Sequence, residues 1–296
     1  PLRYGLAWRT SNLWDMDHQL SVQAVSAPHE ATDPDRISIL PSDRVKILGI
    51  GYRWPMYGIG AVAEATLGHS SVDSGTLGGL FDVKGQGNTA SLKVSKLMNR
   101  RSGWEPRWFV SLERKHFDSQ ILFGGANQAT PISIHPVSIG LSATRRATPE
   151  HPVGYSAYLQ TSGNLAGGTH GDTAAFNAAR AGANANFHVL RSGASIQTDL
   201  EGWARGWGIT ALADAQFTDD LLVSGEQFSA GGASSVRGFS SRGISGDSGV
   251  RIQLEAIGPD WIGDAATGTS LRPVLFLDAA QAWLNQPTVL EVGRTS

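Results

Sequence analysis

Apolar and polar residues alternate one by one along most of this chain. In the segment 48–54, Leu, Ile, Tyr and Trp occupy the even positions, and Gly, Gly and Arg occupy the odd ones. A period of two residues is typical of a β-strand whose two faces meet different surroundings. The pattern predicts about twelve strands, at residues 3–10, 19–24, 48–54, 59–67, 90–95, 108–115, 137–144, 153–160, 184–200, 207–218, 250–256 and 271–278.

Two stretches depart from simple alternation. Within 184–200 the phase slips near Ser192 and Gly193, which predicts one strand with a β-bulge. The Ala-rich stretch 173–185 is compatible with a short helix, although a surface loop is favoured. The prediction is otherwise all-β, with turn-rich links between the strands.

Alternation alone fits a soluble β-sandwich or propeller as well as a transmembrane barrel. Two features favour the barrel. The strands run to about ten residues or more, the length that a membrane-spanning strand needs. Aromatic residues also gather near strand ends, where an interfacial girdle belongs: Tyr4, Trp8, Trp14, Trp54, Tyr57, Trp104, Trp108, Trp203 and Trp207.

Composition agrees with a barrel that hides apolar residues at alternate positions. Charged residues make up 17% of the 296 residues, and no apolar run approaches the length of a membrane helix. The net charge of −2 gives no indication of nucleic-acid binding, and the absence of cysteine excludes thiol chemistry and disulfides. The histidines lack metal-ligand spacing, so neither a metal site nor a cofactor is expected.

The most specific motif is the stretch from Glu226 to Phe239. It contains Glu-Gln-Phe, then Gly231-Gly232, then Val236-Arg237-Gly238-Phe239. This stretch resembles the loop signature of the two-partner secretion transporters (TpsB), in the outer-membrane superfamily that combines POTRA domains with a barrel. The resemblance implies that a loop at 227–245 folds back into the barrel lumen. It also implies that Arg237 pairs there with an acidic residue on the next strand but one.

A second stretch of the chain matches the partner motif of that family, Phe-x-Asp-x-Gly. Here it is Phe276-Leu277-Asp278-Ala279-Ala280, with Ala280 in place of glycine. This departure puts the backbone after Asp278 in doubt, because alanine does not readily take positive φ. Alternation places Asp278 on the other face of its strand from Leu275 and Leu277, which is the lumen side. A guanidinium is a well-matched partner for a carboxylate there.

The resemblance implies an antiparallel barrel of about sixteen strands, with about twelve in this chain. Residues 1–296 are accordingly expected to be an incomplete barrel domain of the bacterial outer membrane, without its POTRA domains and last strands. The implied function is secretion of a large β-rich exoprotein (a haemolysin, adhesin or contact-dependent toxin) through a pore embedded in outer-membrane lipid. No enzymatic activity is expected. An assembly factor of the same superfamily is the main alternative, and a passive porin is a weaker one.

One further motif imitates an enzyme. Gly246-Asp247-Ser248-Gly249-Val250 resembles the box around a serine-protease nucleophile. No companion histidine motif accompanies it, and Val250 stands at the fifth position, where the protease motif has glycine. A turn that leads into the strand 250–256 is the simpler interpretation.

Overall fold

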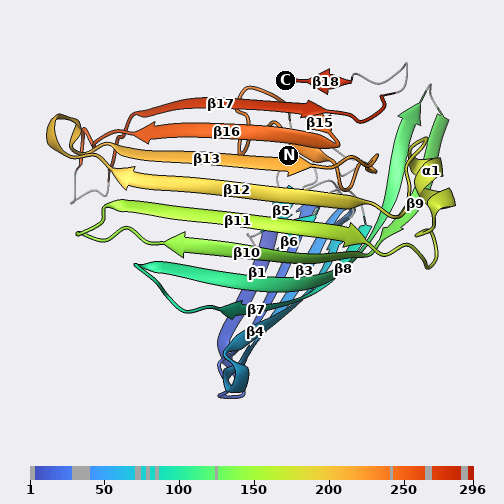
Figure 1. The fold of residues 1–296 in the computed structure, drawn as a ribbon, viewed down its shortest axis with the longest axis horizontal. Coiled ribbons are helices and arrows are strands. Elements are labelled where there is room, and N and C mark those ends of the chain that lie inside the picture. Colours follow the sequence, from blue (N-terminus) through green and yellow to red (C-terminus); the bar gives the residue numbers. More distant parts are fainter. Residues whose placement is uncertain are drawn as a thin grey trace.

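The computed structural model describes residues 4–28, 41–70, 75–77, 81–83, 87–123, 126–240, 243–263, 269–287 and 293–296. Most of them belong to one antiparallel sheet of 14 strands (Figure 1). Its order is β1-β2-β3-β4-β7-β8-β10-β11-β12-β13-β16-β17-β18, and β9 pairs with β8. The sheet curls strongly, and its two outer strands β1 and β18 do not pair with each other within the described residues.

The strands of this sheet are β1 (Tyr4–Leu13), β2 (His18–Pro28), β3 (Pro41–Met56), β4 (Ala61–Ser70), β7 (Gly87–Leu97), β8 (Trp104–Phe123), β9 (Ala126–Ile134), β10 (Pro136–Arg145), β11 (Val153–Asn164), β12 (His188–Asp199), β13 (Gly208–Phe217), β16 (Ser248–Ile257), β17 (Val274–Trp283) and β18 (Arg294–Thr295). Two small hairpins are β5 (Gly75–Leu77) with β6 (Phe81–Val83), and β14 (Phe228–Ala230) with β15 (Ile244–Gly246). The helices are α1 (Thr173–Ala179) and two 3-10 turns, Tyr57–Ile59 and Gly202–Ala204.

Twelve of the described strands have ten residues or more, and each overlaps one of the twelve predicted segments. The predicted all-β fold is therefore confirmed. Since β9 pairs with the far half of β8, the hairpin of these two strands extends beyond the neighbouring β10. No helix among the described residues is long and apolar enough to cross a membrane.

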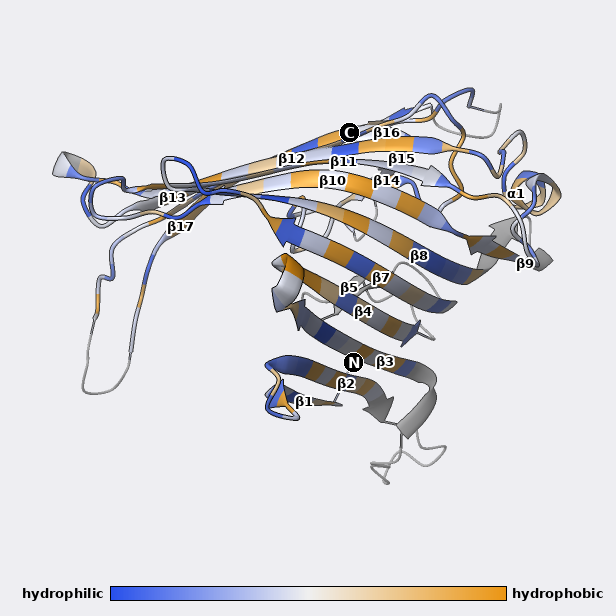
Figure 2. Cartoon of the chain, turned by 60° about the horizontal axis from the view of Figure 1, so that its bottom comes forward, coloured by the Kyte–Doolittle hydropathy of each residue, from blue (hydrophilic) through white to orange (hydrophobic). Residues whose placement is uncertain are grey.

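Hydrophobic and hydrophilic residues alternate along the strands (Figure 2), and the exposures of their side chains show that the two faces of the sheet differ. On β10 and β11, Leu141 and Leu159 point outward and are about half exposed. The serines at 138 and 162 point inward, are buried and share a hydrogen bond of 2.7 Å between their hydroxyls. A continuous exposed belt of large apolar side chains around a polar interior is the arrangement of an outer-membrane β-barrel. The belt belongs in lipid, and the interior forms the lumen.

The two ends of the barrel are different. Long links join the strands at the end that carries α1, for example residues 165–187 and 218–247. At the other end most links are short, such as 14–17 and 57–60, although 258–273 is longer. Outer-membrane barrels have long extracellular loops and short periplasmic turns. We therefore call the α1 end the loop end and assign it to the cell exterior. Exposed Trp14, Trp54 and Tyr57 lie at the opposite, turn end.

The predicted bulge at Ser192 and Gly193 is wrong. Strand β12 keeps one unbroken register with both β11 and β13. The apparent slip of phase has another cause. Leu190 and Ile196 face lipid, whereas Val189 points inward and is buried in an apolar cluster at the loop end. Two successive apolar residues, one inward and one outward, interrupt the alternation of apolar and polar residues in the sequence, although the strand itself is regular.

The Ala-rich stretch 173–185 contains a helix, not only the surface loop that was favoured. Helix α1 begins after Asp172, whose side chain accepts a hydrogen bond from the Ala175 amide (2.9 Å) and so caps it. Phe176 is fully buried in the apolar cluster at the loop end, which we call the rim cluster. Its buried members are Phe117, Ile132, Ile134, Phe176, Ala183, Ala185, Phe187, Val189, Leu222 and Val223.

Candidate functional site: the loop inside the lumen

The link between β13 and β16, residues 218–247, lies inside the barrel. Its hairpin β14–β15 contacts β16 and β17, and a second apolar cluster forms there from Phe228, Ala230, Val236, Ile244 and Ala282. We call this the loop cluster. Residues 241–242 of the predicted loop lie outside the described residues.

Glycines allow the chain to turn within this confined space. Gly231, Gly232 and Gly238 have φ values of 118°, 90° and 91°, in the region that L-residues with a side chain rarely adopt. A β-carbon on Gly231 would lie 2.3 Å from the Ser240 carbonyl oxygen. Phe239 is about half exposed and follows the last of these glycines. The Gly-Gly and Arg-Gly pairs of the motif therefore shape the backbone that presents Arg237.

Arg237 and Asp278 meet inside the lumen, although 41 residues separate them. The guanidinium donates from Nε and Nη2 to the two carboxylate oxygens, at 2.6 and 2.7 Å, and the Arg237 amide donates to Oδ2 at 3.0 Å. The third nitrogen, Nη1, donates to Glu255 on β16 at 2.6 Å. Because the Asp278 side chain is only 2% exposed, this carboxylate depends on Arg237 for its partner charge.

Phe276 and Ala280 are the other two motif residues of β17 that lie near the inserted loop. The Arg237 guanidinium carbon lies 3.7 Å from the centre of the Phe276 ring, a cation–π contact. Ala280 is partly buried against the loop cluster and keeps the regular register of β17 with β16. It is not among the described residues with positive φ. Alanine at this position therefore requires no strained backbone here.

Glu226 anchors the first turn of the loop. Its side chain is 1% exposed and accepts from Lys115 on β8 at 2.9 Å and from Arg191 on β12 at 2.8 Å. Gln216 connects two parts of the 218–247 link. Its side-chain amide donates to the carbonyl oxygens of Glu226 and Asp247, each at 2.9 Å. Burial raises the pKa of Glu226, but the two cations and their hydrogen bonds outweigh burial and lower it to about 2.

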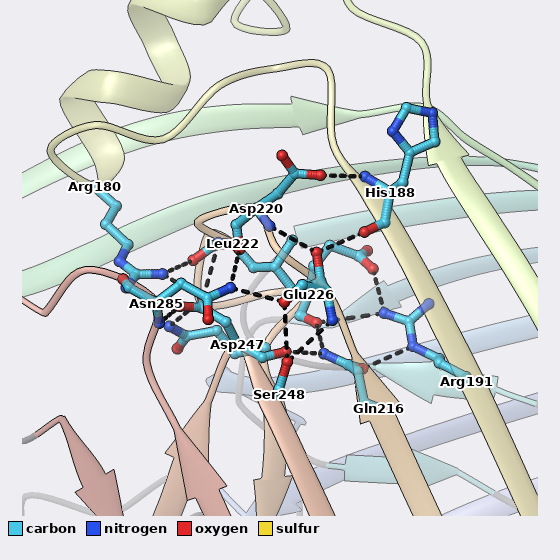
Figure 3. A network of polar contacts seen from close by, with 12 residues as sticks. Arg180, His188, Arg191, Gln216, Asp220, Leu222, Glu226, Asp247, Ser248 and Asn285 are labelled. Carbon is cyan, nitrogen blue, oxygen red and sulfur yellow. Dashed lines mark hydrogen bonds and ion pairs between the residues drawn. The ribbon is translucent and has the colours of Figure 1, made fainter.

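Asp247 anchors the end of the loop (Figure 3). It is fully buried, pairs with Arg180 from the α1 loop, and accepts from the backbone amides of Leu222 (2.9 Å) and Asn285 (2.7 Å). One carboxylate thereby ties together the links β11–β12, β13–β16 and β17–β18. Asp247 belongs to the stretch Gly246–Val250, which resembles a serine-protease box. Ser248 there exchanges hydrogen bonds with the Thr218 backbone at 3.0 and 3.2 Å, as a structural turn residue would.

The sequence did not reveal the partners of Glu226 and Asp247. Alternation does place Lys115 and Arg191 on the inward face, but it does not say which carboxylate they meet. Among the described residues there is no group of three or more His, Asp or Glu side chains that could hold a metal ion. The described contacts of the site are ion pairs and hydrogen bonds. The ion pairs at Glu226, Arg237 and Asp247 hold a loop within a polar lumen.

The low pKa of Glu226 makes the stability of its anchor depend on pH. A carboxyl whose pKa falls from 4.5 to about 2 on folding stabilises the fold above about pH 4.5, and this contribution is lost as the pH falls towards 2. We expect Glu226→Gln to lower the thermal midpoint of the detergent-solubilised protein at pH 6. The difference from the native chain should shrink towards zero near pH 2. A difference that stays constant over this range would contradict the charge pairing.

The fold and this loop define the class of protein: an outer-membrane β-barrel with a loop folded into its lumen. The family model described as haemolysin secretion/activation protein ShlB/FhaC/HecB matches residues 63–289. The chain therefore belongs to that family. A search of curated proteins found no match.

Solved structures support the fold. CdiB from Escherichia coli is 19% identical, with a TM-score of 0.68, covering 99% of this chain and 50% of that one. CdiB from Acinetobacter baumannii is 15% identical, with a TM-score of 0.63, covering 99% and 48%. BamA from Haemophilus ducreyi lacking POTRA domains 1–3 is 14% identical, with a TM-score of 0.60, covering 96% and 55%. The chain thus spans about half the length of each of these structures.

Proposed function

We propose that the whole protein secretes one large, β-rich exoprotein across the outer membrane by the two-partner route. The single observation that carries this proposal is the family loop itself. Its Val-Arg-Gly-Phe motif is seated inside a polar lumen by Arg237 and Asp278, in a chain that belongs to a secretion family. Its partner would be a haemolysin, adhesin or contact-dependent toxin.

The lumen suits an extended polypeptide. Its wall carries charges of both signs and many hydroxyls, such as the Arg251–Asp214 pair and the Ser156–Ser195 contact of 2.7 Å. Such a wall solvates a passing backbone without a strong preference for particular side chains. The substrate would cross unfolded, and folding outside would help to draw it through. Periplasmic POTRA domains would capture it, by adding a strand to a sheet edge. We assign the chain no catalytic reaction.

One alternative has a specific observation in its favour. The structural likeness to BamA fits an assembly factor for outer-membrane proteins. The family model and the higher TM-scores of the two CdiB structures favour secretion.

The experiment that separates these functions asks whether an exoprotein segment can be trapped inside the lumen during export. A photo-crosslinking residue at Ser195, on the inward face of β12, should capture a single large secreted chain. An assembly factor would instead capture various barrel precursors.

A further inference from the structure

The outer wall of the barrel has a recess at the loop end. It has a volume of about 680 Å³ and lies over β3, β4, β7 and β8, beside residues 169–170 of the α1 loop. Its apolar part includes Leu67 and Ala90. Its polar part includes Arg114 with His69, His116 and His170. None of this belongs to the loop site, which lies on the other side of the wall.

Strand registers place Arg114 on the lipid side. It pairs across β7 with Ala90, which pairs in turn with Leu67 on β4. It follows Leu112, an outward residue that is 51% exposed. The next residue, Lys115, points the other way and reaches Glu226 in the lumen. Arg114 is therefore an outward cation at the edge of the apolar belt.

The depth of Arg114 can be estimated from the length of β8. Trp104 stacks on Tyr155 at the turn end, with 5.8 Å between ring centres, and so marks the inner interface. Arg114 lies ten residues further along the strand. At about 3.4 Å per residue and a tilt of about 40°, the rise is about 25 Å, the height of an outer-membrane apolar belt. Arg114 thus lies at the level of the outer-leaflet headgroups.

The charge of Arg114 is not neutralised by the described residues. The cations Arg180, Arg191 and Arg237 each pair with a carboxylate whose side chain is at most 2% exposed. No carboxylate lines the recess among the described residues, and Arg114 makes no ion pair or hydrogen bond with any of them. An arginine that faces lipid without a counter-charge is costly, so an anion from the surroundings would stabilise it.

The rest of the recess has a defined shape. The Ser133 amide donates to the His170 carbonyl oxygen at 2.8 Å, and His170 has φ of 60°, which is uncommon for a residue other than glycine. The rings of His116 and His170 lie 6.1 Å apart. The Nδ1 atom of His116 lies 3.0 Å from the Ser133 hydroxyl, and both imidazoles line the same recess as Arg114.

We propose that this recess binds the phosphate of an outer-leaflet lipid. The Arg114 guanidinium would hold the phosphate oxygens, and the His170 imidazole would add a donor. The first acyl carbons would lie along Leu67 and Ala90. Charge complementarity at headgroup depth, directly above an apolar surface, favours a lipid over a soluble anion. Such a site would fix the depth of the β7–β8 wall in the membrane. It is independent of the proposed export function.

The test uses the whole protein in detergent, with lipid A as the phosphorylated probe and phosphatase-treated lipid A as its matched partner. Native mass spectrometry measures how much of each lipid stays bound. We expect the native protein to prefer the phosphorylated form, and Arg114→Gln to reduce that preference by about tenfold, the worth of one charge-assisted hydrogen bond. Arg114→Lys should retain part of it.

Arg146→Gln is the control, because Arg146 is an exposed arginine in the turn between β10 and β11, at the opposite end. It should behave as the native protein does. Equal binding of both lipid forms by the native protein would overturn the proposal. So would an equal loss in Arg146→Gln, or displacement of lipid A by an equal concentration of inorganic phosphate. Equal binding of both lipid forms by the native protein would overturn the proposal even if Arg114→Gln does not fold, and Arg114→Lys then tests the position of the site.

Discussion

Arg237→Ala is expected to reduce exoprotein in the medium by more than about tenfold while the barrel still folds. The substitution removes the fork to Asp278, the bond to Glu255 and the contact with Phe276. Among the described residues, it leaves the nearly buried Asp278 carboxylate with only the amide of residue 237 as a hydrogen-bond donor. Loss of one partner from a fully buried pair costs roughly 3–5 kcal/mol, and the cost here should be lower because Arg237 is 22% exposed to a wet lumen.

That energy is enough to release the loop tip, since 1.4 kcal/mol already changes an equilibrium tenfold. It is small beside a ladder of many long strands. Arg237→Ala should therefore reduce secretion without reducing the amount of folded barrel. Exoprotein in the medium measures the first, and heat-modifiable gel mobility measures the second.

Two further variants sharpen the Arg237 experiment. Arg237→Lys keeps the charge but cannot make the bidentate fork, so we expect intermediate secretion. Asp278→Ala removes the acceptor entirely and should match Arg237→Ala. Normal secretion by both Arg237→Ala and Asp278→Ala would remove the role assigned to the pair. A loss of folded barrel in either would make the pair structural.

Asp247→Ala is expected to give the largest loss of stability among the loop anchors. The carboxylate has 0% exposure, and its removal takes the counter-charge from Arg180 and the acceptor from the amides of Leu222 and Asn285. Arg180 keeps its hydrogen bond to the Leu222 carbonyl oxygen (2.8 Å). The expected cost is about 3–5 kcal/mol. Its effect should concentrate at the loop end, where three links meet. The temperature at which the folded band disappears on a gel should fall, and proteases should cut the links between β11 and β12 and between β13 and β16 more readily.

Asp219→Ala is the matched control for Asp247→Ala. Asp219 lies in the same link as an exposed carboxylate, so its loss should change stability little. Asp247→Asn should fall between the two, because an amide oxygen still accepts from one backbone group. A melting temperature for Asp247→Ala equal to that of Asp219→Ala would show that the buried pair contributes nothing to holding the loop.

The alternation of the sequence predicted most of the sheet because lipid and lumen impose opposite preferences on successive residues. It failed at Val189, where an inward residue meets the apolar rim cluster and not water. The helix α1 was underestimated for the same reason, since Phe176 packs into that cluster. Periodicity reports which face a residue occupies, but not what covers that face at the ends of the barrel.

The ionic anchors of the loop were only partly predictable. The position of Asp278 on the inward face followed from its phase, and the family motif supplied Arg237 as its partner. Glu226 lies 111 residues from Lys115 and 35 from Arg191, and no local pattern joins charges over such distances. Asp247 stood in a turn-like Gly-Asp-Ser-Gly stretch that indicated exposure. Its burial depends on Arg180, which arrives from a different loop.

The most direct measurement of the central claim is crosslinking to a polypeptide in transit. A photo-crosslinking residue at Ser195 faces the lumen, whereas one at the adjacent Ala194 faces lipid at the same depth. In cells that secrete the exoprotein, light should join that protein to position 195 and leave position 194 unmodified by it. Capture at both positions, or at neither while secretion proceeds, would contradict passage of the exoprotein through this lumen.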